Sequence, residues 1–369
     1  MPLPLVDLKK QYLAIRDEIE AAIEEVVQTT AFINGPAVGA FEESFAGYLG
    51  AGHAIGVGNG TDALALALQA LGIGAGDEVV VPALTFVATS EAVTMTGARP
   101  VFADVDRNSG LIDLEQAGSV LTPQTRAIIP VHLYGQACDM QAVMAFASAR
   151  DLFVVEDAAQ AHGARLNGES VGTIGQAGCF SFYPGKNLGA YGDGGAVVTD
   201  DAGVARMVRM LANHGRIGKF DHEFEGVNSR LDTLQAAILK VKLQHLDRWN
   251  KARRRWAGCY RESLQDISEL SLPAGPEAEE NVFHVYVVRA VERDGLRAHL
   301  RENGIGAGIH YPAPCPLLPA YAHLGHRAGD FPAAEALCSE ILSLPLFPEL
   351  EEADIEQVAT TIKAFYSAR

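Results

Sequence analysis

Short apolar runs alternate with stretches of helical periodicity through most of the chain. Short apolar runs predict buried strands, and apolar residues that recur every three or four positions predict the helices between them. The expected strands cover residues 54–57, 78–81, 100–102, 127–131 and 152–155. The expected helices cover residues 62–71, 87–96, 114–121 and 139–150. This alternation predicts an α/β fold in which a mostly parallel sheet lies between helices.

The two ends of the chain follow other patterns. Residues 9–29 have the apolar spacing of one amphipathic helix, and residues 200–213 and 231–264 also have helical patterns. Farther on we expect a strand near residues 284–290, a helix near 294–303, a strand near 306–310 and helices after Phe331. We therefore expect a large domain of residues 1–248 and a smaller C-terminal α+β domain of residues 249–369, divided within the long helix near Trp249.

The chain is acidic, with 46 Asp and Glu against 29 Lys and Arg and a formal net charge of −17. Nonspecific binding to nucleic acid depends on positive surface, so this charge argues against a nucleic-acid partner. It also repels anions, so an anionic substrate would have to be held by a local group of basic side chains. The length of 369 residues and the 48% hydrophobic content fit a globular protein of more than one domain.

Cysteine and histidine usage argues against disulfides and metal sites. The five cysteines are scattered and form no C-x-x-C pair, as expected for reduced thiols in the cytoplasm. His132, His162, His214 and His222 lack the spacing of metal ligands such as H-E-x-x-H. We find no secretory leader pattern and no apolar run of about 18 residues, so we expect a cytoplasmic protein without a membrane anchor.

One lysine stands in an unusual setting. The aromatic residues around Phe180 and Phe182 predict a buried strand, which breaks at Pro184-Gly185 just before Lys186. Ammonium groups rarely lie among packed aromatic residues without a partner. Burial lowers the pKa of a lysine toward neutrality, and the neutral amine can attack a carbonyl to form a Schiff base. Taken alone, the segment fits equally well a hairpin with an exposed lysine at its turn.

Two further motifs precede this lysine in the chain. The apolar run of residues 152–155 ends in Glu156-Asp157, and open α/β sheets bind ligands beyond the carboxyl ends of their strands. The glycine-rich loop before residue 62 leads into a predicted helix, whose free N–H groups and the Thr61 hydroxyl would form a phosphate cradle. A phosphate cradle, then an acid to keep a pyridine nitrogen protonated, then a lysine to hold an aldehyde is the order that a pyridoxal-phosphate enzyme requires.

The same glycine-rich loop also resembles a dinucleotide fingerprint, which suggests an NAD-dependent oxidoreductase. However, Thr61 stands where G-x-G-x-x-G requires its last glycine. Glu78 precedes the second strand, whereas the ribose-binding acid of that fingerprint follows it. The loop therefore favours pyridoxal phosphate over a nicotinamide cofactor.

Four long segments together resemble one known family. They read GNGTDALALAL, EDAAQAHGA, FSFYPGKNLGAYGDGG and GVNSRLDTLQAAIL, and begin at Gly58, Glu156, Phe180 and Gly226. They are similar, in sequence and in order, to the DegT/DnrJ/EryC1/StrS family of pyridoxal-phosphate-dependent nucleotide-sugar aminotransferases. The likeness extends over nearly the whole chain. It implies fold type I of the pyridoxal-phosphate-dependent transferases, with a mostly parallel, seven-stranded type of sheet and a small C-terminal domain.

The resemblance assigns the cofactor site. Lys186 would form the Schiff base and later carry the proton of the 1,3-shift, and Asp157 would pair with the pyridine N–H. Gln160 would contact the phenolic oxygen of the cofactor, and Phe86 would cover its ring. The residues expected to hold the phosphate are Gly60, Thr61, Asp62 and Ser181. In isolation, an acid after a strand is commonly a helix cap, and a lone Phe is more often part of the core.

The resemblance also implies a homodimer with shared active sites. In the family the loop at residues 227–232 enters the neighbouring subunit's site, so Asn228 would reach the cofactor phosphate there; by itself the loop reads as a helix cap. The residues expected to contact the substrate are Tyr183, Arg230, His310 and Tyr311. Arg216 and Lys219 are further basic groups for a sugar diphosphate, although they could equally be solvated loop charges.

The implied activity is transamination of a nucleotide-linked keto-hexose, with L-glutamate as the amino donor and 2-oxoglutarate as its product. The segment from Gly226 and the His310-Tyr311 pair look most like members that act at C3 of the sugar, so we favour a 3-keto sugar. Members that act at C4 share much of the pattern, and a noncatalytic regulator of the same fold is another alternative. Some members that dehydrate sugars carry His in place of the lysine; because Lys186 is retained, we expect a transaminase of amino-sugar and polysaccharide biosynthesis.

Overall fold

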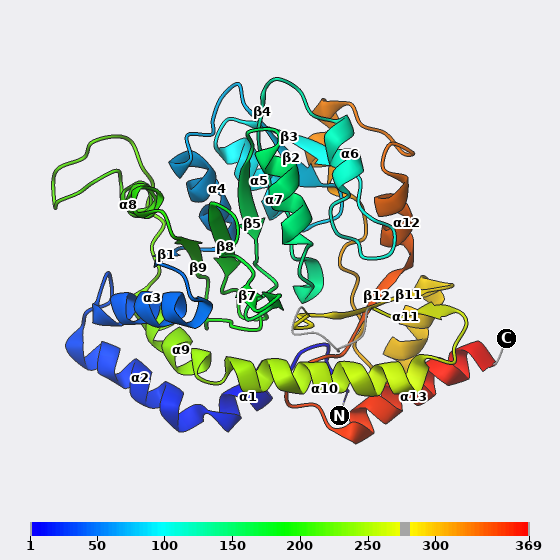
Figure 1. The fold of residues 1–369 in the computed structure, drawn as a ribbon. Coiled ribbons are helices and arrows are strands. Elements are labelled where there is room, and N and C mark those ends of the chain that lie inside the picture. The colour runs from blue at the N-terminus through cyan, green and yellow to red at the C-terminus, as the bar shows by residue number, and fades with distance from the viewer. Residues whose placement is uncertain (1, 274–280, 368–369) are drawn as a thin grey trace.

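A seven-stranded sheet forms the centre of the computed structural model, which describes residues 2–273 and 281–367 (Figure 1). The strands lie in the order β1-β9-β8-β5-β4-β2-β3. Their bounds are β1 (His53–Val57), β2 (Glu78–Pro82), β3 (Arg99–Ala103), β4 (Thr125–Ile128), β5 (Phe153–Asp157), β8 (Ala177–Ser181) and β9 (Gly195–Thr199). Neighbouring strands are parallel except that β9 runs antiparallel to both β1 and β8. The predicted α/β fold with a mostly parallel sheet is therefore confirmed.

Helices cover both faces of this sheet (Figure 1). The helices of this part of the chain are α1 (Leu8–Ala14), α2 (Arg16–Thr29), α3 (Pro36–Leu49), α4 (Gly60–Ala70), α5 (Ala88–Met95), α6 (Leu114–Ser119), α7 (Met140–Ser148), α8 (Ala202–Leu211), α9 (Thr233–Leu243) and α10 (Leu246–Leu264). Successive strand residues point to opposite faces. Cys179 and Val197 therefore pack with α4 and α8, whereas Phe180 and Val198 pack with α3 and α9. Within the described ranges no helix is long and apolar enough to cross a membrane.

A second, smaller unit is built on a three-stranded antiparallel sheet. Its elements are β10 (Leu270–Ser271), β11 (Tyr286–Ala290), β12 (Ile341–Leu344), α11 (Arg293–Glu302), α12 (Pro332–Glu340) and α13 (Glu352–Ser367). Its apolar cluster contains Tyr260 of α10, Tyr286 of β11 and Ile362 of α13, together with Leu3 from the start of the chain. The small α+β unit agrees with the sequence, while the division between residues 248 and 249 remains a prediction.

The sequence patterns were wrong about some element boundaries. The helix predicted over residues 9–29 is two helices, because Ile15 leaves the helical region (φ −132°) and its side chain is buried. The pattern over 231–264 divides at Gln244-His245, where both amides donate to carbonyls three residues back, which is a tighter turn than an α-helix makes. Residues 306–310 form no strand; within them only Gly308 forms a bridge, to Ser343 of β12.

The short connecting elements complete the fold. They are β6 (Arg165–Leu166) and β7 (Glu169–Ser170), which form a hairpin, and the 3₁₀ helices η1 (Leu133–Gly135), η2 (Cys315–Leu317) and η3 (Pro319–Leu324). Of these, η1 follows β4 and carries Tyr134 to the carboxyl end of the sheet, where the predicted site residues lie.

Candidate active site

The predicted motifs meet at the carboxyl edge of the parallel strands. Asp157 is the last residue of β5, and β8 ends at Ser181, just before the lysine loop. The start of α4 packs directly on β8, because a Cβ atom at Gly60 would lie 2.6 Å from the Ser181 Cβ. Likewise, a Cβ at Gly195 would lie 2.4 Å from the carbonyl of Asn59. Only glycine permits these two close approaches, which bring the N-terminus of α4 to the end of β8 and the start of β9.

The N-terminus of α4 presents free backbone donors. The Asn59 side chain caps the helix by accepting from the Asp62 N–H at 2.8 Å. The N–H groups of Gly60 and Thr61 donate to no described residue. The Asp62 amide is therefore engaged within the fold, and its carboxylate accepts a hydrogen bond of 2.6 Å from the Ser229 hydroxyl. The amides of Gly60 and Thr61 are the ones left to bind an anion at this positive helix end.

Asp157 is a buried carboxylate, 6% exposed, with its oxygens held in place. The Thr89 hydroxyl donates to Oδ2 at 2.8 Å, and the Ala159 N–H donates to Oδ1 at 3.1 Å. Thr89 is itself paired with Thr85, hydroxyl to hydroxyl, at 2.8 Å. Burial raises the pKa of Asp157, and the bond from Thr89 and the charge of Lys186 act in the opposite direction. The protonated pyridine nitrogen of the expected cofactor would give this desolvated carboxylate a cationic partner.

The setting of Lys186 favours its uncharged form. Lys186 is half-buried on the loop after β8. Burial lowers the pKa of Lys186 to about 8, although the negative charge of Asp157 acts in the opposite direction. Burial likewise lowers the pKa of the neighbouring His162 to about 3, and the charge of the lysine adds to that shift. A neutral imidazole and one carboxylate therefore lie near the amine, and the expected nucleophile is available near neutral pH.

Gln160 joins two segments of the site. Its Oε1 accepts the Tyr134 N–H at 2.6 Å, and its Nε2 donates to the Tyr311 hydroxyl at 3.0 Å. The Tyr311 ring lies 5.6 Å, centroid to centroid, from that of Phe86, whose side chain is 52% exposed. Phe86 is thus not a core residue, and its ring is free to cover a ligand. Both polar ends of the Gln160 side chain have partners within the fold.

The predicted substrate residues lie on different parts of the fold. His310 is held at Nδ1 by the Ser343 hydroxyl at 2.8 Å, and its carbonyl accepts from the Tyr134 hydroxyl. Burial lowers the pKa of His310, and the charge of the nearby lysine adds to this shift. Tyr183 is exposed, and Arg230 donates to the Asn213 side chain at 3.3 Å. In the described part of the chain, no hydrogen bond joins Tyr183 or Arg230 to His310.

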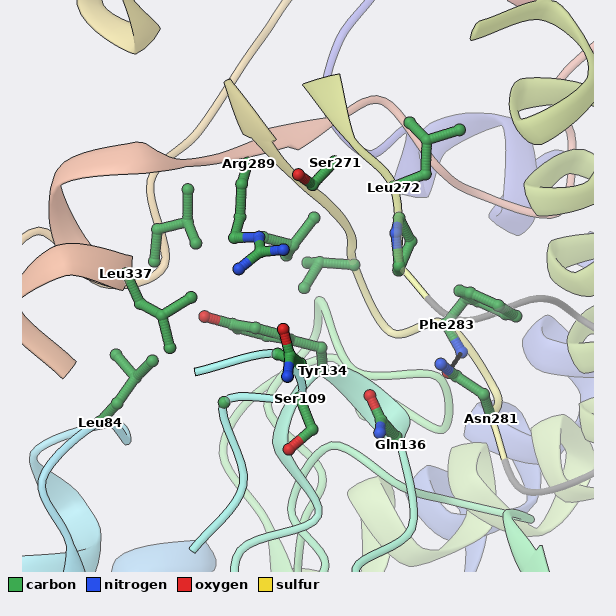
Figure 2. Close-up of a pocket in the computed structure, with 16 residues that line it drawn as sticks. Leu84, Ser109, Tyr134, Gln136, Ser271, Leu272, Asn281, Phe283, Arg289 and Leu337 are labelled. Atoms are coloured by element: carbon green, nitrogen blue, oxygen red, sulfur yellow. Dashed lines mark hydrogen bonds between the residues drawn. The ribbon is translucent and has the colours of Figure 1, made fainter. Parts of the chain in front are cut away.

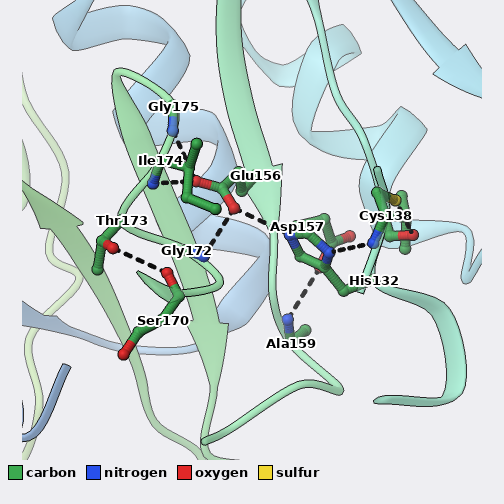
Figure 3. Close-up of polar contacts among 11 residues, drawn as sticks. His132, Cys138, Glu156, Asp157, Ala159, Ser170, Gly172, Thr173, Ile174 and Gly175 are labelled. Atoms are coloured by element: carbon green, nitrogen blue, oxygen red, sulfur yellow. Dashed lines mark hydrogen bonds and ion pairs between the residues drawn. The ribbon is translucent and has the colours of Figure 1, made fainter. Parts of the chain in front are cut away.

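A second buried carboxylate, Glu156, lies beside Asp157 and supports the loops around it (Figure 3). It accepts hydrogen bonds of 2.7 Å from the amides of Gly172, Ile174 and Gly175, and one of 3.0 Å involves His132 Nε2. Because His132 Nδ1 accepts the Cys138 N–H, the ring proton lies on Nε2 and faces Glu156. Burial by itself raises the pKa of Glu156, but these donors lower it overall. Glu156 therefore has a structural role.

A cavity of about 310 Å³ lies between the two units (Figure 2). Arg289 points into it from β11, opposite Tyr134. None of the predicted site residues lines this cavity in the part of the chain that the structure describes. Nor do the described residues contain a cluster of side chains fit to hold a metal ion.

The topology contradicts the dinucleotide alternative. In a dinucleotide fold the strand before the glycine-rich loop pairs in parallel with the strand after the helix. Here β1 lies at the sheet edge and, among the described residues, pairs only with the antiparallel β9, while β2 lies between β4 and β3. The loop at Gly60 is therefore not part of a dinucleotide-binding βαβ unit.

Comparison with known proteins decides the family. One protein-family model matches residues 13–363 of the chain. The chain belongs to the DegT/DnrJ/EryC1/StrS aminotransferase family. The family predicted from the four sequence segments is thereby confirmed.

Three relatives are similar over nearly the whole chain. A protein named pleiotropic regulatory protein, from Geobacillus stearothermophilus, is 46% identical over 368 residues, which cover 99% of each chain. UDP-N-acetyl-3-dehydro-alpha-D-glucosamine 3-aminotransferase of Acidithiobacillus ferrooxidans is 46% identical, and the alignment covers 98% of this chain and 97% of that protein. The dTDP-3-amino-3,4,6-trideoxy-alpha-D-glucose transaminase of Streptomyces venezuelae is 45% identical, and the alignment covers 98% of this chain and 95% of that protein.

Two solved structures extend the comparison. S. venezuelae DesV in complex with a ketimine intermediate has a TM-score of 0.97 and 44% identity, and covers 100% of this chain and 99% of its own. NtdA from Bacillus subtilis with bound cofactor PMP has a TM-score of 0.86 and 31% identity, and covers 94% of this chain and 82% of its own. The fold predicted from the resemblance is therefore confirmed as that of an aminotransferase.

Proposed function

We propose that this protein is a pyridoxal-phosphate-dependent aminotransferase that converts a nucleotide-linked 3-keto sugar to the amino sugar, with L-glutamate as amino donor. The observation that carries the proposal is the setting of Lys186, a half-buried amine whose pKa lies at about 8 and which lies near the carboxylate of Asp157. Family membership supports the reaction class, and the retained lysine favours it over a regulator of the same fold. One relative is named a regulatory protein, so the activity requires a direct test.

The residues of the site fit pyridoxal phosphate. The free amides of Gly60 and Thr61, with the Ser181 hydroxyl beside them, would hold the phosphate at the N-terminus of α4. Asp157 would hold the ring nitrogen in its protonated form, and Phe86 would cover the ring. When bound, the cofactor supplies an electron sink for the carbanion formed at the amino-bearing carbon.

Lys186 has two tasks in this proposal. With a pKa of about 8, the amine is uncharged in roughly a tenth of the protein molecules at pH 7, a far larger fraction than for a solvated lysine. The uncharged amine would bond to the cofactor aldehyde. Once displaced by the amino donor, the same amine would take a proton from one carbon and return it to the other, so burial serves both steps.

The substrate assignment draws on chemistry and on relatives. Two relatives at 45% and 46% identity carry names that place the amino group at C3, one on a UDP sugar and the other on a dTDP sugar. They support the preference for C3 that we expected from the sequence, with a C4-specific enzyme as the alternative. On an acidic protein the diphosphate would be held by Arg216, Lys219 and Arg230, all in or beside the loop that follows α8. Tyr183, His310 and Tyr311 would contact the sugar.

We further infer a homodimer in which each site uses residues of both subunits. Asn228 is exposed, whereas the next residue, Ser229, is buried against Gly58 and Asp62 of its own chain. In the loop that follows α8, the Phe220 side chain is 80% exposed. Ile217 and Val227 of the same loop are 57% and 50% exposed, and this group of exposed apolar side chains supports burial by a second subunit.

The test of the proposed function is to run the reaction backwards. Enzyme, 2-oxoglutarate and a panel of 3-amino and 4-amino nucleotide sugars are combined, and the absorbance of the lysine-bound cofactor is followed. We expect loss of this band and formation of glutamate with 3-amino sugars. A response to 4-amino sugars alone would replace the C3 assignment with C4. No response to any sugar in cofactor-loaded enzyme would contradict the substrate class.

A further inference from the structure

The residue after the lysine is held by a buried pair of amide side chains. Asn187 is 2% exposed and Asn250, on α10, is 1% exposed. Asn187 Nδ2 donates to Asn250 Oδ1 at 2.9 Å and to the Val282 carbonyl at 3.0 Å. Asn250 Nδ2 donates to the His162 carbonyl at 2.8 Å. These bonds occupy both amide protons of Asn187 and the side-chain carbonyl of Asn250. The pair therefore favours one position of the segments to which it is bonded.

The pair connects three segments that border the site. Asn187 lies in the lysine loop after β8, and His162 lies in the loop that follows Asp157. Val282 belongs to the segment before β11, and its amide donates to the Gly135 carbonyl of η1 at 3.0 Å. A single residue of α10, Asn250, therefore touches both the lysine loop and the loop of the buried acid.

Packing leaves the pair no freedom to shift toward the acid's loop. Gly163 adopts a φ of +84°, and a Cβ there would lie 2.8 Å from Asn250 Nδ2 and 2.4 Å from the Tyr48 hydroxyl. The turn at Gly163 thus packs directly on Asn250. A buried amide that lost its partner would keep its desolvation cost, so replacing Asn250 leaves Asn187 Nδ2 with an unmet donor and favours movement of the loop.

We propose that Asn250 is a positioning residue for Lys186, which it holds through Asn187 against the segments around His162 and Val282. The inference rests on the proposed function in one respect, that Lys186 is the amine that bonds the cofactor. Asn250 touches neither reacting group, and it acts by keeping the lysine loop in its desolvated place. Loosening this contact hydrates the amine, which stabilises its charged form and makes it less reactive at neutral pH.

The experiment compares Asn250→Leu with Tyr260→Phe as a matched control. Tyr260 lies on the same helix and its hydroxyl donates one buried hydrogen bond, to the Pro345 carbonyl at 2.9 Å, away from the lysine loop. Cofactor is removed from each protein, and the rate of its return is measured by absorbance from pH 6 to pH 10. Unfolding in urea gives the stability of each variant separately.

We expect Asn250→Leu to raise the pH midpoint of cofactor incorporation and to slow the reaction at pH 7 by about tenfold. Tyr260→Phe should lose stability and keep the wild-type midpoint. Asn250→Ala, which leaves space for a water molecule at the amide, is the second variant should Asn250→Leu not fold, and its midpoint should move in the same direction. A wild-type midpoint in the folded Asn250 variants would overturn the inference. Failure of the wild-type protein to bind cofactor would instead contradict the proposed function.

Discussion

The Thr89 hydroxyl donates a hydrogen bond of 2.8 Å to Oδ2 of Asp157, although the two residues come from α5 and β5. Thr85, one turn before Thr89, is paired with it hydroxyl to hydroxyl at 2.8 Å. The bond from Thr89 therefore orients the carboxylate and opposes the rise in the pKa of Asp157 that burial causes. In the proposed enzyme, this contact keeps Asp157 ionised and aimed at the ring nitrogen.

Replacing Thr89 with Val should reduce turnover while the protein still binds cofactor. Hydrogen bonds to charged groups contribute about 1.5–3 kcal/mol, so we expect a loss of about tenfold to a hundredfold in kcat. Without this donor the pKa of Asp157 rises further, and activity should fall off at a higher pH on the acid side. Steady-state kinetics from pH 5 to pH 9 measure both effects. Thr94→Val, which removes a hydroxyl that donates to the Ser90 carbonyl of the same helix, is the control, and equal losses in both variants would refute the role of Thr89.

Asp157→Asn should retain the cofactor and lose most of its turnover. An amide keeps the size of the side chain, but it carries no charge to hold the ring nitrogen in its protonated form. Cofactor content by absorbance and single-turnover rates with the amino donor measure the two properties separately. Near-wild-type rates would mean that Asp157 only organises the loop after β5, through its bond from the Ala159 N–H.

Gly60→Ala should weaken cofactor binding more than it weakens the fold. The added Cβ would lie 2.6 Å from the Ser181 Cβ, so the start of α4 has to move away from β8 and carry its free amides with it. Gly39→Ala, within α3, meets nothing within 4 Å and serves as the control. We expect cofactor dissociation to accelerate in the first variant alone, as measured by dilution and absorbance. Unchanged dissociation from Gly60→Ala would argue against a phosphate at this helix end.

The rate at which cofactor-free protein takes up pyridoxal phosphate should rise with pH around a midpoint near 8. Burial lowers the pKa of Lys186 from 10.5 to about 8, so the reactive neutral amine forms as the pH passes through that value. A solvated lysine would instead show rates still rising toward pH 10. Reduction with borohydride and peptide mass spectrometry should place the cofactor mass on the Lys186 peptide. An unmodified Lys186 peptide from fully loaded protein would contradict the assignment.

The sequence predicted which candidate site residues lie together where they stand at the ends of strands. Asp157 is the last residue of one buried strand and the loop of Lys186 follows another. Because parallel strands end at one edge of a sheet, their proximity could be predicted from the sequence. Contacts across the fold were missed. Thr89 reaches Asp157 of β5 from helix α5, and Asn250 reaches Asn187 from helix α10. The residues of each pair are far apart in the sequence, so no local spacing predicts these contacts. The only local pattern is the spacing of Thr85 and Thr89, which are one helical turn apart.

Element boundaries failed for a different reason. The run Ile341–Leu344 is buried on all four residues and forms β12, although the sequence favoured helices in this region. A short apolar run has no periodicity that separates a buried strand from a buried helix. Pairing with β11 decides the outcome, and that pairing depends on residues distant in the chain.

The loop that carries Asn228 is fixed on its own subunit, although its outer face is free. The Ser229 amide donates to the Ala212 carbonyl at 2.9 Å, and its hydroxyl bonds to Asp62. Residues next to each other in extended backbone point in opposite directions, so Asn228 faces solvent while Ser229 faces inward. An exposed amide on a rigid support is suited to contact a second subunit, which a mobile side chain would do less well.

Composite sites predict that two inactive variants restore each other. If Asn228 serves the partner's site, a hybrid dimer of Lys186→Ala and Asn228→Ala subunits has one site with both defects and one site with neither. Random mixing makes half of the dimers hybrid, so about a quarter of the wild-type activity per site should return. Subunits mixed under mild denaturation and assayed after refolding measure this, and mixtures of two Lys186→Ala preparations give the background. If Asn228 acted within its own chain, each site of the hybrid would carry one defect and no activity would return. Fully active monomers in solution would exclude shared sites altogether.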